Sequence, residues 1–341
     1  MKQLTYVAPG SLEWREVPEP GIESALDAIV RPVAVATCDL DGAVIHGLAP
    51  LPGPFALGHE SIARVVETGD QVSSVKPGDL VLVPFQISCG SCERCRAGLT
   101  GSCATAGARS AYGMRPIGGD WGSALSDYMR VPFADAMLVK VPTSFQPLAS
   151  LADNIPDGWR SVAPQLQERP GAKVLILGGA GPSSVALYAV AVAAAMGAGG
   201  VTYVDHDEGR LEIASALGAT VTQLSAGDYP KRFGPYPIVV DHTSDQKGLA
   251  CAIRSTEPGG ICTSTAIYFA SETPLPLLEM YTSGLTYITG RVNARPCFEP
   301  LIALLEGGRF HPEKVTTQTA DWDDAVDALN SYTTKLVITR N

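Results

Sequence analysis

Apolar residues between positions 173 and 268 follow an alternating pattern of short strands and longer helices. Val174–Leu177 predicts an apolar strand, which a glycine turn joins to a buried helix over 185–200 and then to a second strand ending at Asp205. Further strands are expected at 237–244 and 259–268, with a glycine-terminated helix between them. This alternation predicts a doubly wound parallel sheet, the α/β fold class.

Residues 1–150 have a different pattern, with many short strands separated by turn prolines and glycines, as in SVKPGDLVLVP. This pattern predicts an irregular β-barrel. We expect one domain formed by 1–150 together with 290–341, and a second domain formed by 151–289.

The composition is that of an ordinary globular protein, with 45% apolar and 18% charged residues among 341. The formal charge is −10, and no lysine- or arginine-rich run interrupts it, which argues against a nucleic-acid partner. No apolar signal segment precedes the first strands, and 185–200 is too short to span a membrane. We therefore expect a cytoplasmic protein with no membrane partner, in which the eight cysteines stay reduced.

Four of these cysteines fall within fifteen residues, at the spacing C-x2-C-x2-C-x7-C. Four thiolates at such spacing can surround one Zn²⁺ tetrahedrally, and the loop around them has too little apolar content to fold without a metal. A closed shell leaves no position for a substrate. We therefore predict a structural zinc ion bound by Cys89, Cys92, Cys95 and Cys103.

The turn after the first strand of the parallel sheet is rich in glycine, and Ser184 stands where a G-x-G-x-x-G motif has its third glycine. Glycines allow the backbone to approach a pyrophosphate, and the following helix offers free N–H groups to it. The predicted cofactor contacts of this turn are Gly178, Gly179, Gly181, Pro182 and Ser183.

Asp205 ends the second strand, 24 residues beyond Gly181. A carboxylate there accepts both ribose hydroxyls and repels a 2′-phosphate, which favours NAD over NADP. Two alternatives remain: Asp205 only caps a turn, or the nearby Arg210 binds a 2′-phosphate. Ala266 and Arg291 are further predicted cofactor contacts, although Arg291 could equally pair with a surface acid.

These motifs, in this order, resemble the zinc-dependent medium-chain alcohol dehydrogenases over nearly the whole chain. The family signature GHE matches residues 58–60, and the family lobe C-G-x-C-x-x-C-x-x-G-x4-C matches 89–103 at every fixed position. The segment LADNIPDGW (151–159) is similar to S-D-I-x-P-T-G-Y in the branch that includes glutathione-independent formaldehyde dehydrogenases. The resemblance implies a GroES-like catalytic domain, a Rossmann domain and a dimer or tetramer.

The resemblance also implies that Cys38, His59 and Asp153 bind a catalytic zinc ion, with Glu60 beside it as an exchanging or outer ligand. Three protein ligands and one open position are the arrangement of a catalytic zinc site. We therefore expect two zinc ions per chain, and hydride transfer between NAD(H) and an alcohol or carbonyl compound.

The chain departs from the family at the proton relay. After the cysteine ligand the family reads C-G-T/S-D-x-H, whereas here Leu40 replaces the hydroxyl residue and Ala43 replaces the histidine. His46 and Asp157 are candidate substitutes for the relay. The alternatives are that His46 is a surface residue and that Asp157 is a turn residue in Ile-Pro-Asp-Gly.

Two further hypotheses stay open because of this departure. One is an NAD(P)H-dependent reductase of an activated C=O, C=N or C=C bond, where proton delivery is less demanding. The other is a non-catalytic binding homologue that has kept the fold. Neither composition nor motif indicates which small molecule is the substrate.

Overall fold

The structure is a computed structural model of the chain, and it describes residues 1–340. Contacts among these residues divide the chain into two compact units. The first unit comprises Met1–Pro156, Val292–Glu299 and the segment from Thr316 onward; the second comprises Asp157–Arg291 and Pro300–Val315. All of 290–341 is expected in the first domain, whereas residues 300–315 group here with the second unit.

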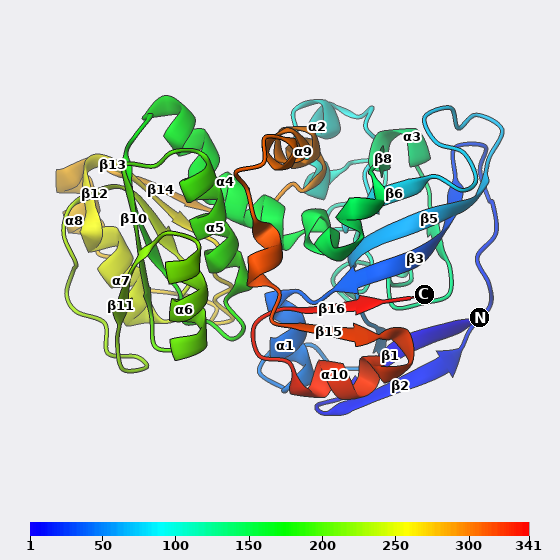
Figure 1. The fold of residues 1–341 in the computed structure, drawn as a ribbon, viewed down its shortest axis with the longest axis horizontal. Coiled ribbons are helices and arrows are strands. Elements are labelled where there is room, and N and C mark those ends of the chain that lie inside the picture. Colours follow the sequence, from blue (N-terminus) through cyan, green and yellow to red (C-terminus); the bar gives the residue numbers. More distant parts are fainter. Residues whose placement is uncertain (341) are drawn as a thin grey trace. The chain divides into compact units, whose positions relative to one another are not determined.

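The second unit is built on a parallel sheet in the order β11-β10-β9-β12-β13-β14. The order reverses between β9 and β12, and Figure 1 shows α5 and α6 on one side of the sheet and α7 and α8 on the other. The predicted doubly wound α/β sheet is therefore confirmed. The strands are β9 (Lys173–Leu177), β10 (Gly200–Asp205), β11 (Thr220–Gln223), β12 (Tyr236–Asp241), β13 (Thr256–Ser264) and β14 (Thr286–Thr289).

The helices of this unit alternate with the strands along the chain. They are α5 (Ser184–Ala195), α6 (Glu208–Ala216), α7 (Gln246–Ser255) and α8 (Leu277–Ser283). Two more helices cross from the first unit into the second: α4 (Asn154–Glu168) at residues 156–157 and α9 (Phe298–Glu306) at residues 299–300. Strand β9 and helix α5 form the centre, since nearly every side chain in both is buried. Strands β12 and β13 end at Asp241 and Ser264, earlier than the predicted ends at 244 and 268.

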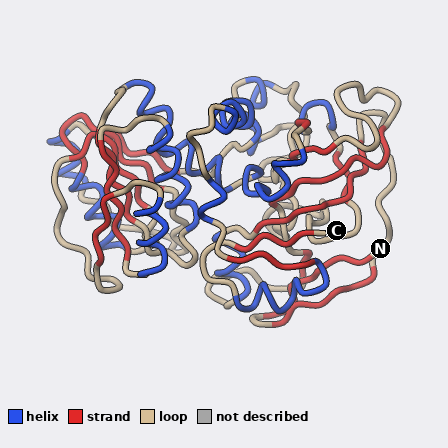
Figure 2. The backbone as a smooth tube through the Cα atoms, in the orientation of Figure 1, coloured by secondary structure: helices blue, strands red, loops and turns tan. Residues whose placement is uncertain are grey.

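The first unit consists mainly of short strands joined by long loops (Figure 2). Its larger sheet has the order β15-β16-β3-β5-β6-β8, with β7 also paired to β3, and a smaller sheet has the order β2-β1-β4. Strand β3 continues through Pro32 because the register with β5 shifts beside it. The strands are β1 (Lys2–Ala8), β2 (Ser11–Glu16), β3 (Ala28–Ala36), β4 (Phe55–Ala56), β5 (Glu60–Thr68), β6 (Leu80–Val83), β7 (Met129–Val131), β8 (Val139–Lys140), β15 (Gln318–Asp321) and β16 (Leu336–Thr339).

The helices of the first unit are short, and most lie in its loops. They are α1 (Asp39–Ile45), α2 (Glu93–Arg96), α3 (Ala134–Met137) and α10 (Ala325–Ser331), with 3-10 turns that include Thr100–Ser102 and Thr143–Ala152. No helix within residues 1–340 has the length and apolar character needed to cross a membrane.

Candidate active site

Among the described residues, Cys38, His59, Glu60 and Asp153 each bring one potential ligand atom to a single point in the first unit, and these atoms lie within 4.8 Å of one another. Cys38 is the N-cap of α1, His59 and Glu60 stand at the start of β5, and Asp153 follows the 3-10 turn Thr143–Ala152. All four side chains are buried. The structure thus brings Asp153 beside His59, which precedes it by 94 positions.

His59 lies between two carboxylates. Its Nε2 is 3.2 Å from Asp153 Oδ2, and its Nδ1 is 3.7 Å from Asp41 Oδ1. Ligand atoms held about 2.0–2.1 Å from a tetrahedral zinc ion lie about 3.3 Å apart, so the first distance suits two ligands of one ion. The other oxygen of Asp41 accepts the backbone N–H of Cys38 at 2.8 Å.

Three polar residues of this site are not among those predicted from the sequence: Asp41, Asn154 and Lys335. Asp41 had a local signal, because the third residue of a helix often bonds back to the N-cap N–H. No local sequence signal indicated Lys335, because it follows its partner Glu60 by 275 residues. Its fully buried ammonium donates to Glu60 Oε2 at 2.9 Å, to Asn154 Oδ1 at 2.8 Å and to the carbonyl of Thr37.

The site contains more buried acidic than basic groups, which changes their protonation. Burial, reinforced by the Asp153 carboxylate, raises the pKa of the Cys38 thiol well above its usual value. Burial also raises the pKa of Glu60 to about 7, although Lys335 opposes this. Burial alone would lower the pKa of His59, but Asp41 and Asp153 raise it to about 9.

All three pKa shifts are upward, so each group binds a proton more readily than usual. A bound proton relieves the excess of negative charge in this buried space. A divalent cation would relieve the same excess. The donor set of one thiol, one imidazole and two carboxylates therefore fits zinc.

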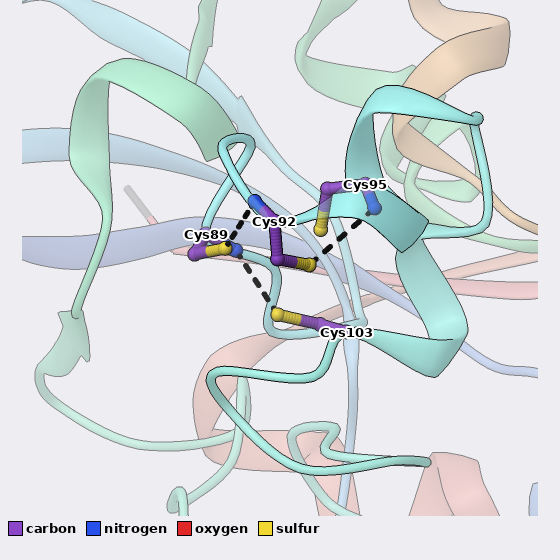
Figure 3. A group of neighbouring side chains, drawn as sticks. All are labelled: Cys89, Cys92, Cys95 and Cys103. Carbon is purple, nitrogen blue, oxygen red and sulfur yellow. Dashed lines mark hydrogen bonds between the residues drawn. The ribbon is translucent and has the colours of Figure 1, made fainter.

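Figure 3 shows a second candidate metal site of the chain. The second cluster comprises the four cysteines of the 89–103 lobe, whose sulfur atoms also lie within 4.8 Å of one another. Their own backbone amides donate to the sulfurs, from Cys92 to Cys89 at 3.3 Å and from Cys95 to Cys92 at 3.5 Å. Desolvation opposes ionisation, yet hydrogen bonds from Thr105 and Ser91 lower the pKa of Cys89 to about 5. The lobe fits a closed four-thiolate zinc site.

The 89–103 lobe is also tied to the segment that returns to the first unit. The backbone N–H of Gly101 donates to Asn293 Oδ1 at 2.8 Å. Gln86, just before the lobe, donates to the carbonyl of Val292 at 2.8 Å and accepts the N–H of Ala294 at 3.2 Å. The four cysteines therefore belong to a turn whose position is linked to residues 292–294.

Apolar side chains occupy two positions at which the resembling family has its proton relay. Leu40 and Ala43 lie on α1, half-buried against the core of the first unit, while His46 is exposed at the end of that helix. The alternative of a turn at Ile-Pro-Asp-Gly is wrong, because these residues lie in α4. Asp157 forms an ion pair with Arg160, one helical turn further along.

The glycine turn of the second unit has the backbone conformation that its sequence predicts. Gly179 and Gly181 have φ values of 123° and 49°, and Ser183 also has a positive φ, of 56°. The Ser183 hydroxyl accepts the N–H of Gly179 at 3.2 Å. Gly178 is buried and Pro182 follows Gly181, so the predicted contacts form one turn between β9 and α5.

Asp205 is both a turn cap and an ion-pair partner. It is only 2% exposed, and its Oδ1 accepts the backbone amides of His206 and Asp207 at 2.7 and 3.1 Å. Arg210 donates to both of its oxygens, at 2.9 and 2.7 Å, and Tyr203 donates to Oδ2 at 2.5 Å. Desolvation opposes the charge, but these bonds, led by those of Arg210, hold the pKa of Asp205 below its usual value.

The two remaining predicted cofactor contacts lie at the ends of later strands. Ala266 follows β13 and is half-buried, and Arg291 follows β14 and is exposed. Both stay predictions, since their places in the fold do not by themselves identify a ligand.

Comparison with known families gives two matches that together cover most of the chain. Residues 24–143 match the family described as "Alcohol dehydrogenase GroES-like domain", and residues 184–307 match the family described as "Zinc-binding dehydrogenase". The first match contains Cys38, His59, Glu60 and the cysteine lobe.

Individual relatives extend this similarity along the chain. The chain is 28% identical over 331 residues, covering 95% of it and 83% of the relative, to "Probable zinc-binding alcohol dehydrogenase Rv1895" of Mycobacterium tuberculosis. It is 30% identical, over 67% of its length and 77% of the relative, to "Medium chain reductase/dehydrogenase ucsI" of an Acremonium species. Its fold matches "Alcohol dehydrogenase TADH from Thermus sp. ATN1" with a TM-score of 0.87 and 27% identity over the whole of both chains.

Proposed function

Because this chain belongs to the zinc-dependent alcohol dehydrogenases of the medium-chain dehydrogenase/reductase family, we propose that it transfers hydride between NAD(H) and an alcohol or carbonyl substrate. The chain is an NAD(P)-dependent oxidoreductase that acts on small molecules. The proposed reaction takes place at a zinc ion bound by Cys38, His59 and Asp153. The convergence of these buried donors beside Glu60 is the observation that carries the proposal. The presence of Asp153 among them supports the branch with an aspartate ligand.

The bound groups would supply the reactive chemistry: zinc polarises a substrate oxygen, and the nicotinamide accepts or donates hydride. The residues of the chain prepare the site for them. Cys38 and Asp153 provide two negative charges that balance a divalent ion. Asp41 faces Nδ1 of His59 and favours the proton on that nitrogen, which leaves the lone pair of Nε2 for a metal ion. Lys335 holds the Glu60 carboxylate through Oε2.

Proton transfer is the step for which this chain differs most from its family. Leu40 and Ala43 cannot carry a proton, which leaves Asp157 and His46 as the candidates. We propose Asp157, because His46 is exposed at the end of α1, whereas Asp157 is half-buried and the Arg160 guanidinium holds its carboxylate in place. The apolar setting of Leu40 supports a second candidate function, the reduction of an activated C=O, C=N or C=C bond.

For the cofactor we propose NAD in preference to NADP. The Arg210 guanidinium is 5% exposed and committed to Asp205 and to the carbonyl of Gly181, so its charge is not offered to a 2′-phosphate. The proposed contacts are the glycine turn (Gly178, Gly179, Gly181, Pro182, Ser183), Asp205, Arg210, Ala266 and Arg291.

For the assembly we propose a homo-oligomer formed through the β14 edge of the parallel sheet. Strand β14 is the last strand in the sheet order, and the adjacent α8 exposes Leu277, Leu278 and Tyr281 by 65%, 76% and 85%. An unpaired edge beside apolar side chains is suited to another protein surface. The cytoplasm remains the proposed location, and cysteines clustered at metal-ligand spacing agree with a reducing compartment.

The zinc content of the chain tests the proposed function. Native mass spectrometry should find two zinc ions in the wild type and one in Cys38→Ser. The matched control Cys297→Ser changes a cysteine outside both clusters and should keep two. One zinc ion in both the wild type and Cys38→Ser would reject the catalytic zinc. A second assay separates the two candidate functions. It compares the rate of alcohol oxidation with NAD with the rates of carbonyl and conjugated-alkene reduction with NADH.

A further inference from the structure

Asn154 is the first residue of α4 and follows the proposed ligand Asp153 directly. It is 2% exposed. Its side-chain Nδ2 lies 3.3 Å from the sulfur of Cys38 and 3.2 Å from Asp153 Oδ2, and its backbone N–H donates to Glu60 Oε1 at 3.3 Å. One residue therefore contacts three of the four side chains that converge at the site.

The chemistry of Lys335 fixes which way this amide points. An ammonium group only donates hydrogen bonds, so the atom 2.8 Å from its Nζ must be the amide oxygen of Asn154. The amide nitrogen then faces Cys38 and Asp153, and both of these are acceptors when ionised. The reverse orientation would place an oxygen against the thiolate and the carboxylate, and an N–H against the ammonium.

A hydrogen bond from an amide to a thiolate stabilises the lone pairs of the sulfur. The sulfur then donates less electron density to a bound metal, and the metal stays a stronger Lewis acid. The adjacent Lys335 charge polarises the amide in the same direction, because hydrogen bonds in a chain strengthen one another. The buried positive charge thus acts on the thiolate through the side chain of Asn154.

We infer that Asn154 is a positioning residue that holds Cys38 and Asp153 side by side and weakens the thiolate as a metal donor through an N–H···S hydrogen bond. This inference rests on the proposed function, because it requires a metal ion at Cys38. A purely structural role is a poor explanation for the amide. The similar stretch S-D-I-x-P-T-G-Y has isoleucine at this position, so an apolar side chain is compatible with the same local sequence.

The test uses the full chain with zinc in the cysteine lobe and cobalt(II) at the Cys38 site, a loading verified by native mass spectrometry. The thiolate-to-cobalt charge-transfer band reports the energy of the sulfur lone pairs, and its loss in Cys38→Ser assigns it. Asn154→Leu keeps a similar volume and removes the donor. Asn154→Asp, nearly identical in shape, replaces the donor with an acceptor and serves if the leucine variant does not fold.

We expect the band to move to lower energy in both variants, because the sulfur lone pairs lose the hydrogen bond that stabilises them. Asn330→Asp, an exposed change on α10, should leave the band unchanged. An unshifted band in variants that still bind cobalt would overturn the inference and leave the proposed function intact. A wild type that binds no cobalt at Cys38 would overturn both.

Discussion

Lys335 and Glu60 form an ion pair from which solvent is excluded, with Nζ 2.9 Å from Oε2 and both side chains 0% exposed. Removing only the cation would leave a buried carboxylate without its partner, which destabilises proteins by about 3–5 kcal/mol. We therefore expect Lys335→Met to unfold at clearly lower urea concentration than the wild type. The double variant Lys335→Met with Glu60→Gln should recover part of the loss. Equal stability of wild type and Lys335→Met would show that the pair has no net role in folding.

Removal of metal from the cysteine lobe should affect local order more than the parallel sheet. The lobe has few apolar residues, so four thiolates without an ion have little else to hold them. In Cys103→Ser we expect one zinc ion fewer per chain and rapid proteolysis between residues 89 and 103. Limited digestion followed by mass spectrometry would locate the cuts. Cys251→Ser, in the second unit, should keep the wild-type digestion pattern.

The Asp205–Arg210 pair predicts how cofactor preference can be changed. Asp205→Ser removes the carboxylate and frees the Arg210 guanidinium to meet a 2′-phosphate. We expect the Kd for NADH to rise and that for NADPH to fall, so that their ratio changes by at least about tenfold, or 1.4 kcal/mol. Fluorescence titration of both cofactors measures it. An unchanged ratio would remove Asp205 from the selection of the cofactor.

Acid should weaken one surface contact at a defined pH. Slight burial would raise the pKa of Asp135, but the amides and hydroxyls of Ser73 and Ser74 lower it from 3.8 to about 2. Because the folded-state pKa is the lower one, the stabilisation is present above about pH 4 and disappears as the pH falls towards 2. The stability difference between the wild type and Asp135→Asn should therefore shrink over that interval. Asp70→Asn, a nearby exposed change, controls for the altered net charge.

The exposed side of α8 gives a test of assembly. Leu278→Asp places a charge at a 76% exposed leucine beside the edge strand β14, and it should reduce the molar mass measured by light scattering if that edge joins two copies. Leu48→Asp makes the same change at a 72% exposed leucine of the first unit and should not. A wild type that is already monomeric would contradict the proposed oligomer directly.

Features encoded by neighbouring residues could be predicted from the sequence. The cysteine lobe lies within fifteen residues, and the strand, glycine turn and helix of the second unit are consecutive. Cys38, His59 and Asp153 come from separate elements, so only the family resemblance could join them before the structure did. The turn alternative for Ile-Pro-Asp-Gly is wrong because a proline is also tolerated in the first turn of a helix, as Pro156 is in α4.

The contacts of Lys335 and Asn154 were beyond local reasoning for a different physical reason. Lys335 reaches Glu60 only because β16 pairs with β3 in the sheet, which brings residues 337–339 beside residues 34–36. The amide of Asn154 has an assigned direction only once the lysine is in place. A sequence pattern records neither sheet order nor a partner 181 residues away.

The position of β16 has a consequence for biosynthesis. The larger sheet of the first unit is completed by β16, which is translated after all six strands of the parallel sheet, and those strands lie within the continuous stretch 157–291. The ribosome delivers Cys38, His59, Glu60 and Asp153 long before Lys335. The parallel sheet can therefore form while the chain is still being made, but the buried site in the first unit acquires its cation only after β16 and the residues before it have left the exit tunnel.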